Sequence, residues 1–266
     1  MKIKVLWAKD PKIPVVKIVE IDSPKTNYQL DLDNIDESYK DLAEDEKAYA
    51  QKMEMKREII ADKGIWTAKK RYILNVHDQE GVRYKTPKLK MMGIETAKSS
   101  TPMWCRKKLE QGIKVVMNET EHDVWEFITK AKSEFSKLPI EEVSFPRGVQ
   151  NVTKYSNPAS IYKKGTPIHV RGSLLYNNYL SKYNIDKKYP VITNGEKVKF
   201  CYLKLPNVIN ENVISFVNAL PKEFELESYI DYETQFNKSF VEPLGVILNK
   251  IGWTTEPVST LDNFFG

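Results

Sequence analysis

Apolar and polar residues alternate over much of the first part of the chain, which is the pattern of strands with one buried face. The alternation in residues 1–22 predicts two short strands, and residues 65–76 (IWTAKKRYILNV) predict a longer one rich in β-branched and aromatic side chains. The next residues, HDQEG at 77–81, have the composition of a turn, and residues 82–96 (VRYKTPKLKMMGIET) continue as extended chain. These segments together predict a β-hairpin.

The spacing of apolar residues changes to a helical period after this hairpin. Ser99, Ser100 and Thr101 before Pro102 predict a helix start, with a hydroxyl cap and proline at the first helical position. Further elements are expected as follows: helices over 102–117, 121–138, 169–183 and 229–251, a strand over 196–205, and a loop-rich stretch over 146–167. This order predicts an α+β fold, in which short antiparallel strands precede a mostly helical part with a small β element.

Composition and charge place few limits on function. The chain has 266 residues and a formal net charge of +5, which permits a polyanionic partner without requiring one. Cys105 and Cys201 lack the paired spacing of a metal site and are expected to be reduced core residues. The acidic run at 29–47 is expected to be solvated rather than metal-binding, because no strand or turn signal frames it. Without a signal-peptide pattern or an apolar run of about 20 residues, the sequence predicts a soluble intracellular protein with no membrane association.

The most distinctive polar feature is a run of three cations, Lys69, Lys70 and Arg71, followed by Tyr72. If residues 65–76 form one strand, Lys69 and Arg71 share one face while Lys70 and Tyr72 share the other. Lysines can protect an exposed strand edge from aggregation, and they can also contact the phosphates of a nucleic-acid duplex. The residue types alone leave both interpretations open.

Two further groups could bind an anion. Lys98, Ser99 and Ser100 lead into the expected helix start at Pro102, where free backbone N–H groups favour negative charge, although simple capping is the commoner role of such residues. His169 and Arg171 lie beside Gly172, a residue that allows close backbone approach. A single histidine–arginine pair of this kind is weak evidence for a site.

One segment resembles a known family. Residues 69–102 (KKRYILNVHDQEGVRYKTPKLKMMGIETAKSSTP) closely resemble the end of the palm and the start of the thumb in the replicative DNA polymerases of T-even-type phages, which are family B enzymes. The resemblance continues less evenly from about residue 52 to the C-terminus. It includes residues 52–68 (KMEMKREIIADKGIWTA), 167–180 (PIHVRGSLLYNNYL) and 231–253 (DYETQFNKSFVEPLGVILNKIGW).

The resemblance implies DNA-binding roles for these residues. Lys69, Lys70, Arg71 and Tyr72 would hold the primer–template duplex near the primer 3′ end. Lys98, Ser99 and Ser100 would contact the primer strand, and His169 and Arg171 would follow the DNA backbone. Related polymerases end in a short apolar-aromatic peptide that docks on the sliding clamp, and Leu261, Phe264 and Phe265 occupy comparable places. The alternative for these three is a tail packed on the thumb.

The family's catalytic carboxylates have no counterpart in this sequence. They lie in a D-x-x-S-L-Y-P-S-type strand and a Y-G-D-T-D-S hairpin, and Ile21-Asp22-Ser23 resembles only the end of the second. The fingers motif K-x-x-x-N-S-x-Y-G is also missing. Nucleotidyl transfer needs two metal ions held by carboxylates. The chain is therefore expected to bind no cofactor and to be inactive alone, with Mg²⁺ at the active site of the assembled polymerase.

The resemblance implies a division into an N-terminal extension that helps assembly (1–50), the end of the palm with the basic hairpin (51–98), a thumb (99–258) and a clamp-binding tail (259–266). Because the chain opens with methionine, we expect a natural split gene, although an expression fragment would look the same. The expected partners are primer–template DNA, the N-terminal half of the polymerase and the sliding clamp, in the cytoplasm of an infected bacterial host. The alternatives are a stand-alone DNA-binding accessory protein and, less favoured, a self-sufficient enzyme that uses the acidic run.

Overall fold

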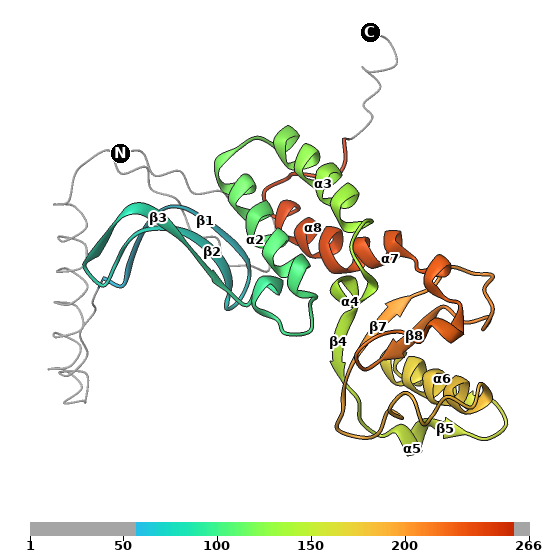
Figure 1. Cartoon of the computed structure of the whole chain (residues 1–266). Coiled ribbons are helices and arrows are strands. Elements are labelled where there is room, and N and C mark those ends of the chain that lie inside the picture. Colours follow the sequence, from blue (N-terminus) through green and yellow to red (C-terminus); the bar gives the residue numbers. More distant parts are fainter. Residues whose placement is uncertain (1–56, 258–266) are drawn as a thin grey trace, which may run out of the picture. The chain divides into compact units, whose positions relative to one another are not determined.

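The computed structural model describes residues 57–257. Three predicted features lie outside the described residues: the strands in 1–22, the acidic run at 29–47, and the tail with Leu261, Phe264 and Phe265. The chain forms two compact units (Figure 1). Among the described residues, the sheet unit consists of residues 57–94 together with Asn249–Gly252, and the helical unit consists of Glu95–Leu248 and residues 253–257.

The sheet unit is an antiparallel meander of three strands, β1 (Ile59–Ala68), β2 (Arg71–Gln79) and β3 (Val82–Met92). The predicted hairpin is confirmed by the pairing of β2 with β3. Glu80 and Gly81 connect these strands, and both have a positive φ, of 52° and 85°. Two-residue turns of this kind match the twist of antiparallel strands, which explains the glycine in HDQEG.

The prediction that residues 65–76 form one strand is wrong, because the chain reverses direction within them. Trp66 pairs with Tyr72 and Ala68 pairs with Arg71, so Lys69 and Lys70 form the turn between β1 and β2. Lys70 adopts the left-handed conformation, with a φ of 61°. The faces predicted for Lys69 and Arg71 therefore do not apply, and the two lysines lie instead at a hairpin tip.

The buried carboxylate of Asp78 holds the other end of this sheet together. It lies 3.5 Å from Arg57 and 3.8 Å from Arg83, and it accepts a hydrogen bond of 3.0 Å from the backbone N–H of Gly81. Only 2% of Asp78 is exposed, so its charge needs these partners. The positive charge of Arg83 on β3 is thus partly offset within the sheet, because Asp78 pairs with both Arg57 and Arg83.

Packed helices form one half of the helical unit (Figure 1). The predicted helices over 102–117 and 121–138 are confirmed as α2 (Met103–Asn118) and α3 (Glu121–Phe135). The predicted hydroxyl cap of α2 is wrong: Pro102 itself is the N-cap residue, and no side chain caps the helix. Thr101 is buried, and its backbone N–H donates to the carbonyl of Lys98 in a preceding turn.

The helix predicted over 229–251 is shorter than expected and contains an irregularity. It runs as α7 (Tyr232–Phe236), a π-helical turn (Asn237–Val241) and α8 (Glu242–Leu248). Within it, Ser239 donates a hydrogen bond of 2.6 Å to the carbonyl of Gln235. The wholly buried amide of Gln235 donates to the carbonyl of Val143 at 2.6 Å and accepts from the backbone N–H of Tyr202 at 3.2 Å. Gln235 therefore fastens this helix to the segments that contain Val143 and Tyr202.

The other half of the helical unit is a three-stranded antiparallel sheet, in the order β4-β7-β8, that packs against α6 (Ile168–Lys182). Its strands are β4 (Phe145–Gly148), β7 (Lys197–Tyr202) and β8 (Val213–Phe216). The remaining short elements are α4 (Ile140–Val143), α5 (Val152–Tyr155), β5 (Ser156–Asn157), β6 (Ile161–Tyr162) and 3₁₀ turns at Glu95–Ala97, Lys222–Phe224 and Glu227–Tyr229. The predicted helix over 169–183 and strand over 196–205 are confirmed, as is the α+β fold class.

Both cysteines are free and buried, as predicted. Burial raises the pKa of the Cys105 thiol to about 11 and that of Cys201 to about 12. Neither thiol is therefore a reactive thiolate near neutral pH.

None of the helices within residues 57–257 is long and apolar enough to cross a membrane.

Candidate nucleic-acid interface

The tip of the β1–β2 hairpin carries the first candidate residues. Lys69 and Lys70 are exposed, and neither forms an ion pair with another described residue. Arg71 and Tyr72 are half-buried at the start of β2. The turn thus presents two adjacent cations to solvent, where they can meet a polyanion without first losing a protein partner.

Gly93 shapes this tip from the end of β3. It adopts a φ of 68°, and a Cβ atom added to it would lie 2.7 Å from the backbone carbonyl oxygen of Lys70. Any larger residue would therefore push against the Lys70 turn. The close approach explains why a glycine occupies this position. It also ties the conformation of the lysine turn to the chain at the end of β3.

The second candidate group lies before α2 in the helical unit. The ammonium group of Lys98 pairs with Glu95 at 2.6 Å, so its charge is partly offset. Ser99 is exposed and Ser100 is half-buried. The guanidinium of Arg147 on β4 donates to the backbone carbonyl of Ser100 at 3.4 Å. A cation that is far away in the sequence therefore supports this segment.

His169 and Arg171 lie in the first turn of α6. Burial and the nearby charge of Arg147 lower the pKa of His169 below its ordinary value of 6.5, so the imidazole is mostly neutral at pH 7. Arg171 donates a hydrogen bond to the side chain of Asn212, and its guanidinium lies 5.7 Å from the ring centroid of Tyr162. Its buried Nε has no hydrogen-bond partner within residues 57–257.

Arg147 was missed by the sequence analysis, and it links two of the predicted groups. Its side chain bonds Ser100, and its charge acts on His169. No described carboxylate forms an ion pair with Arg147. The nearby starts of α2 and α6 have no side-chain cap and no acidic residue in the first turn, so the partial positive charge of each helix end adds to that of Arg147. The arrangement favours an anion.

The backbone of His169 is held in place by two serines. Ser173 and Ser215 donate to its carbonyl oxygen at 2.8 Å and 2.9 Å. Gly172 lets α6 approach β8 closely, since a Cβ atom there would lie 2.5 Å from the Ser215 hydroxyl and 2.8 Å from its backbone nitrogen. The close approach inferred for this glycine is therefore an approach to the neighbouring strand, which orients the first turn of α6.

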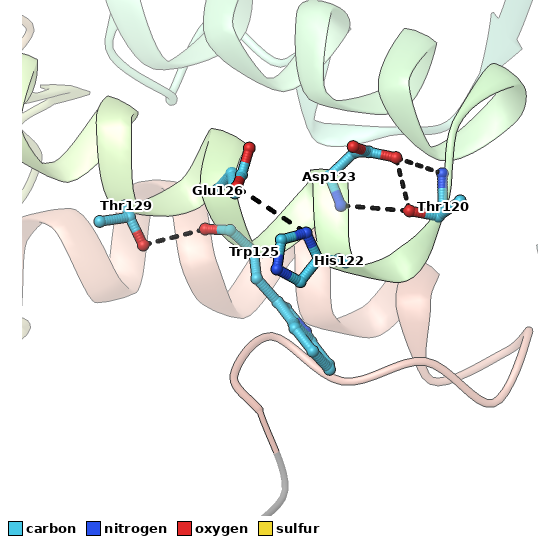
Figure 2. A network of polar contacts seen from close by, with 6 residues as sticks. All are labelled: Thr120, His122, Asp123, Trp125, Glu126 and Thr129. Atoms are coloured by element: carbon cyan, nitrogen blue, oxygen red, sulfur yellow. Dashed lines mark hydrogen bonds and ion pairs between the residues drawn. The ribbon is translucent and has the colours of Figure 1, made fainter.

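One group of potential metal ligands occurs in residues 57–257, at the start of α3: His122, Asp123 and Glu126 (Figure 2). The Asp123 carboxylate accepts the backbone N–H and hydroxyl of Thr120 in a capping box, and these hydrogen bonds lower its pKa. His122 and Glu126 are exposed and lie 3.8 Å apart. The Asp123 carboxylate is already engaged as a cap, which leaves one carboxylate, that of Glu126, so the group does not fit a catalytic centre that holds two ions.

Comparison with known proteins shows similarity to two phage DNA polymerases. No protein-family profile matches it. It is 33% identical over 244 residues to the DNA-directed DNA polymerase of Enterobacteria phage T4, in a match that covers 87% of this chain and 27% of the relative. It is 36% identical over 223 residues to that of Escherichia phage RB69, covering 79% of this chain and 24% of the relative.

This chain is related to a C-terminal part of the T-even-type phage DNA polymerases. The resemblance inferred from residues 69–102 is thereby confirmed. The chain spans about a quarter of the length of these relatives. The roles of individual residues, including Lys69, Lys70, His169 and Arg171, stay predictions.

Proposed function

We propose that this chain is the duplex-holding part of a phage family B DNA polymerase, and that its two units are the end of the palm and the thumb. The observation that carries this proposal is the exposed pair Lys69–Lys70 at a hairpin tip, within the segment that most closely resembles the polymerases. The Arg147 region supplies a second cationic surface on the helical unit. Both surfaces would contact the DNA backbone.

Backbone contacts suit a replicative polymerase, because it must hold every sequence equally well. Phosphate contacts fix the position of a protein on the duplex and carry no sequence information. Lys69, Lys70, Arg71 and Tyr72 would hold the duplex near the primer 3′ end. Lys98, Ser99, Ser100, His169 and Arg171 would bind the strand backbones, with Arg147 positioned among them.

The reactive centre would come from another chain. The carboxylate motifs of the family are missing from the sequence, and the ligand group on α3 does not fit a two-metal site. We propose that a second polypeptide supplies the carboxylates, the Mg²⁺ ions they hold and the fingers, and that residues 1–50 help the two parts assemble. The complex would work in the cytoplasm of the infected bacterium. The C-terminal residues Leu261, Phe264 and Phe265 would dock on the sliding clamp.

The salt dependence of duplex binding tests the DNA-holding role. Affinity of the whole chain for a blunt duplex should fall steeply between about 50 and 200 mM salt, with the same slope for duplexes of different sequence. Fluorescence anisotropy with two labelled duplexes measures this. An affinity that does not change with salt, or that depends on sequence, would count against the proposal. If the chain bound duplex DNA but associated with no other polymerase part, the result would instead favour the accessory-protein alternative.

A further inference from the structure

The chain that follows α8 is fastened to the start of α3 by one residue, Thr254. Its backbone N–H donates to the Glu121 carboxylate at 2.7 Å, and its carbonyl accepts a hydrogen bond of 2.9 Å from the indole N–H of Trp125. The Thr254 hydroxyl lies 3.0 Å from the same Glu121 oxygen and 2.7 Å from the Glu256 carbonyl. Figure 2 shows the Trp125 side chain pointing toward this segment.

These contacts hold a segment that has no helix or strand of its own. Thr255 adds a packing contact, because a Cβ atom on Gly245 of α8 would lie 3.3 Å from the Thr255 methyl group. Residues 253–257 are thus fixed on the helical unit between a charged acceptor, an indole donor and a helix surface. Hydrogen bonds to a charged acceptor are among the stronger ones in proteins. The base of the C-terminal tail therefore has a defined position.

We propose that Glu121, Trp125 and Thr254 form a latch that fixes the point from which the C-terminal peptide reaches the sliding clamp. This inference rests on the proposed clamp docking of Leu261, Phe264 and Phe265. The three latch residues are positioning residues, because they act through the tail and would not themselves contact the clamp. The latch matters when the chain binds DNA and the clamp at the same time, because the tail then connects the DNA-bound helical unit to the clamp.

The physical reason is the effective concentration of a tethered peptide. Linking two binding events makes the second intramolecular, and once the tether is longer than the distance it must span, its effective concentration falls roughly as the −3/2 power of tether length. Opening the latch adds residues 253–257 to the tether before Leu261. We expect this to weaken clamp binding on DNA by about fourfold, because the stretch before Leu261 grows from residues 258–260 to residues 253–260. Binding of the chain to the clamp alone should not change, because the docking peptide is the same.

The test uses the full chain with the double substitution Glu121→Ala and Trp125→Phe. The matched control is Glu126→Ala, which removes a carboxylate from the same helix that does not bond the tail segment. Two affinities are measured, for the cognate clamp free in solution and for the clamp loaded on a primed duplex. Hydrogen exchange at the Thr254 amide reports whether the latch is open, and the double variant should exchange faster than the parent chain.

The expected result is about fourfold weaker binding to the loaded clamp, unchanged binding to the free clamp, and no effect of the control. The latch would be overturned if the parent chain and the double variant bound the loaded clamp with equal affinity, or if their Thr254 amides exchanged at equal rates. Removal of residues 258–266 separates the two proposals. If that truncation changes neither affinity, clamp docking is wrong and the latch falls with it; if only the truncation has an effect, the latch alone is wrong.

Discussion

Replacing Lys69 and Lys70 with alanine should lower the affinity for duplex DNA by about 30-fold at low salt. Each lysine at the hairpin tip is exposed and forms no ion pair with a described residue, so its charge is available to a phosphate. A phosphate contact of this kind contributes roughly 1 kcal/mol, and about 2 kcal/mol corresponds to the expected change. Sequence preference should stay the same, because phosphates carry no sequence information.

The salt dependence distinguishes lost contacts from a general loss of charge. The slope of log affinity against log salt should fall by about 2 in the double variant, since each neutralised phosphate contributes about 0.9. Substituting Lys130 and Lys137 with alanine is the matched control, because both are exposed lysines on the other unit and their loss changes the net charge equally. If the two double variants lose affinity equally, the hairpin tip is not a DNA contact.

Replacing Gly172 with alanine should destabilise the helical unit by about 1–3 kcal/mol and weaken duplex binding. The added methyl group would lie within 3.0 Å of the Ser215 hydroxyl, the Ser215 nitrogen and the Ile214 carbonyl carbon. Two of these atoms belong to the backbone of β8, so the strand and α6 must move apart. The hydrogen bond from Ser215 that holds the His169 carbonyl would lengthen, and the first turn of α6 would lose its orientation.

Gly148→Ala is the control for this substitution. Gly148 lies on β4 beside Arg147, it has no left-handed φ, and no atom lies within 4 Å of its added Cβ. Urea denaturation should therefore show a lower midpoint for Gly172→Ala and little change for Gly148→Ala. Equal midpoints for Gly172→Ala and the parent chain would mean that α6 does not approach β8 as closely as described.

Where local pattern determined the structure, the sequence predicted it well. The apolar spacing of α2 and α3 places their buried residues on one face: Leu109, Ile113 and Val116 in the first helix, Val124, Ile128 and Phe135 in the second. The β2–β3 hairpin also follows from its turn residues. The turn at Lys69–Lys70 was missed because neither residue is glycine, asparagine or aspartate, and a left-handed lysine leaves no compositional signal.

The candidate site was only partly accessible to sequence reasoning. Exposure of Lys69 and Lys70 follows from the cost of burying adjacent cations, whichever secondary structure they adopt. The sequence could not indicate Arg147, because its place in the candidate interface depends on tertiary structure. The pairing of β4 with β7 brings this residue, from a stretch predicted to be loop-rich, close to Ser100 and His169. The role of Gly172 likewise depends on which strand α6 packs against.

The most direct test of the central claim is primer extension with a labelled primer–template, Mg²⁺ and nucleotides. The assay compares this chain alone, a T-even-type polymerase part that ends where the resemblance to this chain begins, and a mixture of the two. Extension well above that of either component is expected only in the mixture, because one chain would supply the metal-binding carboxylates and the other would hold the duplex. Extension by this chain alone, or a mixture no more active than the other part by itself, would contradict it.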